Sequence, residues 1–159
     1  MGELSSSAKK FQNALQALGF PLQVVEMPAT TRTANDAAAA VGCEVGQIVK
    51  SLVFKKMTSG TALLITVSGS NRVNEPAVAA LIGEPIGKAD AEFVRQQTGF
   101  VIGGVPPAGH LQPIDTLIDQ DLFQYTEIWA AAGTPNAVFR LAPQDLALMT
   151  HGKVVKITG

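Results

Sequence analysis

The sequence has little cysteine, histidine or charge, and it has no long hydrophobic run. A single cysteine, Cys43, excludes an intrachain disulfide, and with two histidines there is no zinc-ligand spacing. Charged residues make up 16% of the chain and the formal net charge is −1, which excludes a global basic field for nucleic acid, so any such contact should be local. Apolar runs such as residues 37–41 are too short for a bilayer span, and the N-terminus lacks a signal-peptide core. We therefore expect a soluble protein of the reducing cytoplasm.

What the 159 residues do contain is a 47% hydrophobic share, enough for the core of one ordinary domain. Phe11, Leu15 and Leu18 recur at helical spacing before Gly19. Further helices are predicted behind the N-caps Thr33, Asn74 and Asp90 and from Pro143, and they end at Gly42, Gly83 and Gly99 where a glycine follows. Strands are predicted at residues 22–25, 48–54, 61–67, 111–118, 127–130, 137–141 and 154–157. Because strands and helices mix without strict alternation, the pattern favours an α+β fold, a largely antiparallel, barrel-like sheet with flanking helices in a single domain, over a doubly wound one.

Lys50 is the anomaly within the strongest predicted strand, residues 48–54. Strand alternation places it on the same face as Ile48, Leu52 and Phe54. An unpaired charge there would be costly, so its ammonium should reach a partner across that face or lie in a cleft. An edge-strand lysine that extends to water is the alternative.

The stretch from Gly99 to His110 is rich in glycine and proline after a β-type run at residues 100–102. Glycines let backbone N–H groups approach a ligand, while prolines fix the shape of a loop. We expect a rigid, concave turn lined by backbone. The glycines alone favour a tight loop between two strands, whereas His110 at its end favours a ligand site.

Several familiar motifs are absent: the sequence has no phosphate loop, no nucleophile elbow and no dinucleotide-binding glycine turn. Cys43 is expected to be a small buried residue, and His151 a surface turn residue. What remains is a cation in an apolar strand, a loop of backbone donors and His110. This set could stabilise an oxyanion on an ester carbonyl or hold a small polar ligand. Since no side-chain nucleophile is evident, hydrolysis would rely on a positioned water or on a substrate hydroxyl.

Several segments together resemble the YbaK family of free-standing aminoacyl-tRNA deacylases, which is related to the editing domain of bacterial prolyl-tRNA synthetases. The resemblance runs from Thr33 to Leu146, and residues 1–159 are expected to form one such domain. Lys50 combined with the loop from Gly104 to His110 is its most specific part. The matching residues are Thr33 with the alanine-rich helix up to Gly42, residues 48–54, residues 68–73, Thr98, Gly99 and residues 103–110.

The resemblance implies hydrolysis of the ester that joins a wrong amino acid to the 3′ end of a tRNA. It assigns Lys50, Gly104 and His110 to the catalytic site, with Lys50 holding polar groups of the substrate near the ester. A hydroxyl of the terminal ribose would assist water, and no metal or cofactor is required. The substrate-binding residues implied by the resemblance are Ser68, Gly69, Arg72, Gly103 and Pro107.

Pro106 and Ala108 depart from the family pattern, which has a small polar and a larger apolar residue at these positions. Both would alter the amino-acid pocket, so the amino acid removed is left open. The chain has no room for a synthetase core and is expected to act in trans on the 3′ acceptor end of a mischarged tRNA. A synthetase or an elongation factor is a candidate partner. Arg72, Lys55 and Lys56 would lie near phosphates, or they are ordinary solvated charges.

Other functions stay open. A binding module of the same fold would hold a nucleotide or a tRNA end without turnover. An interaction domain would use the glycine loop only as structure, and Gly104→Ala would then change stability alone. The protein could also be an unrelated hydrolase of small esters. Comparing the turnover of aminoacyl-tRNA with that of a simple ester would distinguish this function from deacylation of tRNA.

Overall fold

A central hairpin organises the computed structural model, which describes residues 4–159. Strand β2 (Ile48–Lys56) pairs antiparallel with β3 (Ala62–Ser68), in a register that sets Val49 opposite Ser68 and Lys55 opposite Ala62. Every residue of β3 is buried, as is typical of a strand covered on both faces. The strands predicted at residues 48–54 and 61–67 are therefore confirmed, and they form a hairpin.

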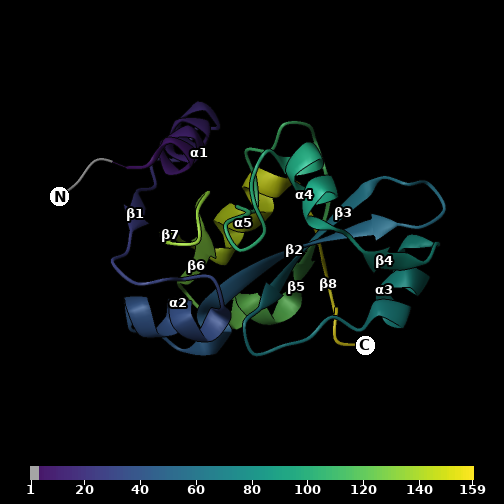
Figure 1. Ribbon diagram of the computed structural model, residues 1–159. Coiled ribbons are helices and arrows are strands. Elements are labelled where there is room, and N and C mark those ends of the chain that lie inside the picture. Colours follow the sequence, from purple (N-terminus) through teal and green to yellow (C-terminus); the bar gives the residue numbers. More distant parts are fainter. Residues whose placement is uncertain (1–3) are drawn as a thin grey trace.

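One open sheet of eight strands surrounds this hairpin, in the order β1-β7-β6-β2-β3-β5-β8, with β4 paired to β2 beside that path (Figure 1). Four of the seven pairings are antiparallel and three are parallel. The predicted α+β class with a largely antiparallel sheet is confirmed, and β1 and β8 form the open edges. The further strands are β1 (Val24–Glu26), β4 (Ile86–Lys88), β5 (Asp115–Asp119), β6 (Ile128–Ala131), β7 (Ala137–Leu141) and β8 (Lys153–Val155).

Helices cover both faces of the sheet. The largest buried cluster joins α1, α4 and α5 to Val49 and Leu64, whereas α2 packs on Ile48 and α3 on Leu63 and Ile65. Because neighbouring strand residues point to opposite faces, α2 and α3 lie on the face opposite α1, α4 and α5. The helices are α1 (Ser6–Ala17), α2 (Ala34–Val41), α3 (Glu75–Ile82), α4 (Ala91–Thr98) and α5 (Pro143–Thr150), with short 3₁₀ turns η1 (Val45–Gln47) and η2 (Gln120–Gln124). None of the helices within residues 4–159 combines the length and the hydropathy needed to cross a bilayer.

The predicted helix ends are confirmed in their capping details. The side chains of Thr33, Asn74 and Asp90 accept hydrogen bonds from backbone N–H groups in the first turns of α2, α3 and α4. Each of these helices is followed by a glycine in the left-handed conformation: Gly42, Gly83 and Gly99.

Other local predictions were wrong. Residues 100–102 form no strand, because the chain turns back after Gly99: Phe100 is buried and accepts a hydrogen bond from Thr98 Oγ1, while Val101 and Ile102 are exposed. Leu18 lies beyond α1 and is 48% exposed. The last strand ends at Val155, not at residue 157, and β4 was not predicted at all.

Candidate active site

The site begins at an interruption of the sheet along β2. On the edge of β2 that faces away from β3, β6 pairs with Ile48 and Val49 only, and β4 pairs with residues 54–56. Residues 50–53 have no strand partner on this edge. A cavity of about 580 Å³ opens beside them, a volume typical of small-molecule sites.

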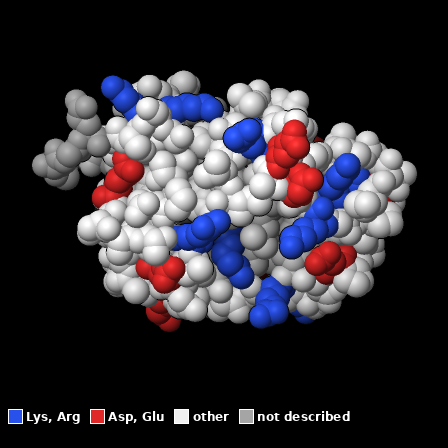
Figure 2. All heavy atoms as spheres, in the orientation of Figure 1, with Lys and Arg blue, Asp and Glu red and all other residues white. Residues whose placement is uncertain are grey.

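The walls of the cavity are mostly apolar and come from several elements. Its lining comprises β2, the segment before α2, Ala37, the end of β4 with Ala89, Val94, parts of the loop after α4, and strands β6 and β7. Three basic residues, Arg32, Lys50 and Lys88, also line it. In Figure 2 basic side chains gather around the middle of the face shown. The cavity therefore offers positive charge against apolar walls.

The ammonium of Lys50 has a hydrogen-bond partner, and the residue also lines a cavity. It lines the cavity, and its Nζ donates a hydrogen bond of 2.6 Å to the carbonyl oxygen of Asn71. The Asn71 side chain donates in turn to the carboxylates of Asp119 and Asp121, at 2.9 and 2.8 Å. Burial lowers the pKa of Lys50, Arg72 lowers it further, and Asp119 acts in the opposite direction. The loop after β3 thus fixes the position of the ammonium.

The glycine loop after α4 closes one side of the cavity. Gly103 lines the cavity and lies under Arg32, whose side-chain carbons a Cβ at Gly103 would meet at 2.8 Å. Gly104 lies behind it, where its carbonyl accepts a 2.9 Å hydrogen bond from the N–H of Gly133. A Cβ at Gly104 would sit 2.7 Å from the backbone of Thr134, so close packing against the β6–β7 turn requires glycine.

His110 and Pro107 belong to the same loop, but neither is among the described residues that line the cavity. His110 Nε2 donates a 2.7 Å hydrogen bond to the carbonyl oxygen of Pro106, which identifies Nε2 as the protonated nitrogen. Burial lowers the pKa of His110, and the hydrogen bond to Pro106 opposes this shift. In this geometry His110 stabilises the loop after α4 through its hydrogen bond to Pro106.

Ser68, Gly69 and Arg72 belong to the loop that holds Lys50, and among the described residues none of the three lines the cavity. Ser68 Oγ donates to the carbonyl of Gly46 at 2.7 Å, and its N–H donates to Asp119 at 3.0 Å. The N–H of Gly69 donates to the carbonyl of Ile48 at 2.7 Å. Arg72 is exposed and acts on Lys50 through its charge. The structure brings these residues next to Lys50, behind the cavity wall.

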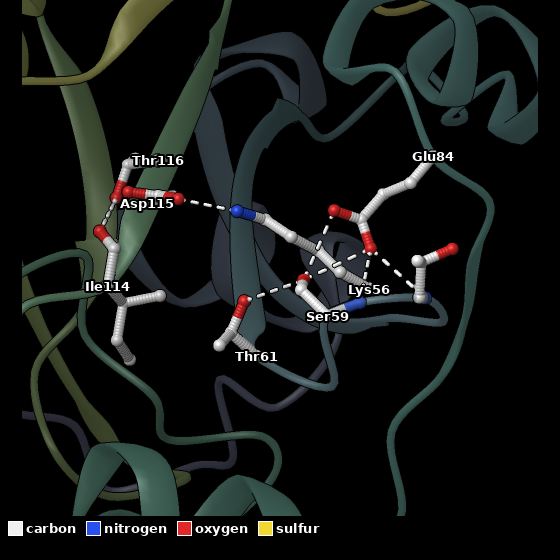
Figure 3. A network of polar contacts seen from close by, with 8 residues as sticks. Lys56, Ser59, Thr61, Glu84, Ile114, Asp115 and Thr116 are labelled. Atoms are coloured by element: carbon white, nitrogen blue, oxygen red, sulfur yellow. Dashed lines mark hydrogen bonds and ion pairs between the residues drawn. The ribbon is translucent and has the colours of Figure 1, made fainter.

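Lys55 and Lys56 lie at the hairpin end of β2. Lys56 forms an ion pair of 2.5 Å with Asp115 of β5, next to a cluster in which Glu84 accepts hydrogen bonds from Ser59 (Figure 3). Lys55 lies over the ring of Phe93, 5.4 Å from its centre. Lys56 is therefore engaged within the fold.

Sequence reasoning missed several residues of the cavity: Arg32, Ser51, Lys88 and Trp129. Arg32 precedes α2 and Lys88 ends β4, so the two are far apart in the sequence and only the tertiary fold brings both to the cavity. Ser51 had one available signal, its position next to the anomalous lysine. Trp129 could have been suspected because it is the single tryptophan.

The remaining candidates lie elsewhere. Cys43 is half-buried, and its burial together with the nearby Glu44 raises the pKa of the thiol. His151 is exposed and ends α5 in the left-handed conformation, as predicted for a surface turn. Within residues 4–159 no three His, Cys, Asp or Glu side chains group as metal ligands.

Comparison of the sequence with known proteins identifies related families and proteins. Residues 28–148 match the model of the aminoacyl-tRNA editing domain. The chain is 27% identical to the uncharacterized protein YwhH of Bacillus subtilis (strain 168), over 82% of this chain and 83% of that one. It is also 33% identical to part of the proline–tRNA ligase of Limosilactobacillus fermentum, over 57% of this chain and 16% of the ligase.

Among solved structures, the fold matches one provisionally assigned as a trans-editing enzyme for prolyl tRNA synthetase. The two chains superpose with a TM-score of 0.94 at 51% sequence identity, over 99% of each. The family model covers most of the chain, including β2 and the glycine loop. The protein therefore belongs to the aminoacyl-tRNA editing domain family.

Proposed function

We propose that this protein is a trans-acting aminoacyl-tRNA deacylase that hydrolyses the ester of a mischarged tRNA, of the kind related to prolyl-tRNA editing. The observation that carries the proposal is the ammonium of Lys50 at the wall of an apolar cavity, in a chain of the editing family. The aminoacylated 3′ end of the tRNA would enter this cavity. The substrate makes the cytoplasm the expected compartment.

In the proposed reaction a water oxygen attacks the ester carbonyl carbon, and the carbonyl oxygen becomes an oxyanion. The bond to the ribose oxygen then breaks, that oxygen takes up a proton, and the free amino acid and the tRNA leave. Lys50 supplies positive charge where negative charge develops. The described residues that line the cavity include no His, Cys, Asp or Glu, so positioning of water by the substrate's own ribose hydroxyl fits the site.

The glycine loop would shape the cavity through Gly103, with Gly104, Pro107 and His110 supporting it from behind. Ser68, Gly69 and Arg72 would act by holding Lys50 and setting its charge. A synthetase or an elongation factor that holds the same tRNA remains the candidate partner. Position supports these roles: Gly103 and Lys50 line the cavity, Lys50 Nζ donates to Asn71 in the loop of Ser68, Gly69 and Arg72, and His110 donates to Pro106 within the glycine loop.

The test is the release of amino acid from a panel of mischarged tRNAs, beginning with alanyl, cysteinyl, seryl and threonyl esters. We expect one ester to be hydrolysed, and we expect Lys50→Ala to lower kcat/KM by about 100-fold or more, since removal of one oxyanion-stabilising group typically has that effect. Lys153→Ala in β8, an exposed cation, is the matched control. Urea unfolding of each variant verifies that it is folded.

Either of two results would overturn the proposal. In the first, no ester of the panel turns over above background, which would favour a module that binds without turnover. In the second, folded Lys50→Ala is as active as wild type. Faster turnover of a simple ester than of any aminoacyl-tRNA would indicate a hydrolase of small molecules.

A further inference from the structure

Ser51, next to Lys50 in β2, has a polar side chain that the fold leaves unsatisfied. Its Oγ is buried and has no hydrogen-bond partner, the one such side-chain atom found within residues 4–159. Buried polar atoms are nearly always hydrogen-bonded, so an exception calls for a physical reason. Ser51 also lines the cavity, so rotation about its Cα–Cβ bond is the motion that would turn this buried group toward a bound molecule.

The backbone of Ser51 faces the same cavity. The backbone groups of the even-numbered residues of β2 form the hydrogen bonds on the β3 side: the carbonyl of Ile48 accepts from Gly69, and the N–H of Lys56 donates to the carbonyl of Thr61. Because the direction of backbone groups alternates along a strand, the N–H and C=O of Ser51 and Val53 point to the opposite edge. There the pairing with β6 ends at Val49 and the pairing with β4 begins at Phe54. The gap between these ladders leaves a short free strand edge at Ser51, at the cavity wall.

An aminoacyl ester carries the groups that complete such an edge. Its α-amino nitrogen and its ester carbonyl are separated by one carbon, as are the N–H and C=O of a residue in a strand. In a hydrogen-bonded pair of an antiparallel sheet, two opposite residues exchange both of these bonds. One amino acid can therefore satisfy one residue of the free edge.

We propose that the aminoacyl group binds as a one-residue β-strand opposite Ser51. Its α-ammonium donates to the Ser51 carbonyl, its ester carbonyl accepts from the Ser51 N–H, and Ser51 Oγ completes the polar contacts of the bound group. This inference rests on the proposed function and names the recognition element of that site. It makes the free α-amino group a requirement for binding, and it makes the Ser51 N–H a donor to the oxyanion that forms from the carbonyl.

The pairing also predicts where the side chain of the amino acid lies. Residues directly opposite in a sheet direct their side chains to the same face. The Ser51 side chain is on the face of Val49, whose buried cluster includes Ala89, Val94 and Val105, and all of these line the cavity. The amino-acid side chain would therefore meet short apolar groups, on the side of the sheet opposite the Lys50 side chain.

The first test uses two stable analogues, 3′-alanylamino-3′-deoxyadenosine and its propionyl counterpart, which lacks only the amino group. Amide hydrogen exchange of the wild-type protein is measured by NMR with each. We expect the alanyl analogue to slow exchange at Ser51 by about tenfold or more, and the propionyl analogue to bind at least about tenfold more weakly. The amides of Lys50 and Leu52 point toward β3 and serve as internal references.

Two results of this test would overturn the inference. One is binding of the alanyl analogue with no change in exchange at Ser51; the other is equal affinity for both analogues. Protection of Ser51 and Val53 by trialanine, without protection by the alanyl analogue, would also overturn it and would assign peptide binding to the edge. Each of these outcomes is independent of catalysis, so failure of the proposed function is seen separately, as absence of turnover by wild type.

The second test addresses Oγ through kinetics with the ester that wild type hydrolyses. Ser51→Ala is expected to raise KM about fivefold or more, and Ser51→Thr, which keeps a hydroxyl, is expected to recover most of this loss. Thr58→Ala removes an exposed hydroxyl at the hairpin tip and is the control. Wild-type KM in Ser51→Ala, or equal defects in Ser51→Ala and Ser51→Thr, would overturn the role of Oγ.

Discussion

Lys50 and Ser51 are adjacent in sequence but serve the cavity in different ways. The side chain of Lys50 crosses one face of the sheet to the Asn71 carbonyl, whereas Ser51 turns its backbone to the free edge and its side chain to the other face. In the proposed complex, charge and main-chain hydrogen bonds would therefore reach one bound group from neighbouring residues. A strand supplies this arrangement because consecutive residues alternate both in the face that their side chains occupy and in the edge to which their backbone groups point.

His110 gives a prediction about stability. Truncation in His110→Ala leaves the buried carbonyl of Pro106 without its 2.7 Å donor. We expect the free energy of unfolding at pH 8 to fall by about 1–3 kcal/mol, the usual effect of an unsatisfied buried group. Urea unfolding measures it. His151→Asn, which removes the other histidine and tolerates the left-handed conformation, is the control.

The same histidine predicts a pH dependence with a definite sign. Because burial lowers the pKa of His110 below its ordinary 6.5, the unfolded chain binds more protons than the folded one between the two values. The contribution of His110 to stability is therefore complete above pH 6.5 and is lost as pH falls from there through the lowered pKa. The difference in stability between wild type and His110→Ala should shrink in this window. A constant difference across it would contradict the prediction.

At the residue scale, the sequence predicted Lys50 because a charge in an apolar strand is anomalous wherever the strand lies. It predicted His110 as part of the same site, but the loop turns the imidazole inward to Pro106. Which side of a loop a side chain occupies depends on its tertiary contacts. Arg32 and Lys88 gave no signal, since exposed cations are common in any sequence.

At the scale of elements, the glycine loop gives a prediction that separates close packing from backbone strain. In Gly104→Ala the new Cβ meets three backbone atoms of Thr134 at 2.7–2.9 Å, and the loop must shift. We expect the free energy of unfolding, measured with urea, to fall by about 3 kcal/mol. We also expect a lower kcat/KM, because the neighbouring Gly103 lines the cavity. Gly60→Ala is the control: its φ of +76° lies in open space, so only strain of about 1 kcal/mol applies.

Two outcomes of this comparison would contradict the prediction. Equal losses in Gly104→Ala and Gly60→Ala would show that packing on the β6–β7 turn contributes little. A destabilised Gly104→Ala with unchanged kcat/KM would support the alternative in which the loop is purely structural.

Elements with local signals were predicted well, and elements without them were missed. Capping side chains at Thr33, Asn74 and Asp90 act within one helical turn, so the sequence shows them directly. Strand β4 has three residues and exists because β2 leaves room for it. The β-branched residues Val101 and Ile102 look like a strand, but Gly99 reverses the chain before they can pair.

At the scale of the whole molecule, the cavity arises from the order of the strands. β2 pairs on one edge with β6, from the last third of the chain, and with β4, from its middle, and neither ladder spans the full strand. No local pattern in residues 48–56 indicates where one partner stops and the next begins. The family resemblance could predict the architecture and the lysine, whereas the free edge required the structure.

The balance of charge over the whole molecule gives a last prediction, about binding of the tRNA end. With a net charge of −1, attraction of the polyanion depends on local cations. Arg32 and Lys88 line the cavity, and within residues 4–159 neither forms an ion pair. Two phosphate contacts on a single strand give a slope of about −1.4 in log K against log salt, or about a sevenfold loss of affinity from 50 to 200 mM salt.

Arg32→Gln and Lys88→Gln should each make this slope shallower by about 0.7, because each removes one phosphate contact. Lys153→Gln in β8, three strands from β2 along the sheet, should leave the slope unchanged. Titration of labelled tRNA at four salt concentrations measures all three variants against wild type. A steep wild-type slope, or a slope that neither Arg32→Gln nor Lys88→Gln alters, would mean that the tRNA backbone contacts another surface. If the wild-type slope is shallow and each variant makes it shallower by the amount expected for one phosphate contact, the phosphates of the 3′ end lie at the mouth of the cavity. The ester must enter there to reach Lys50 and the edge of β2.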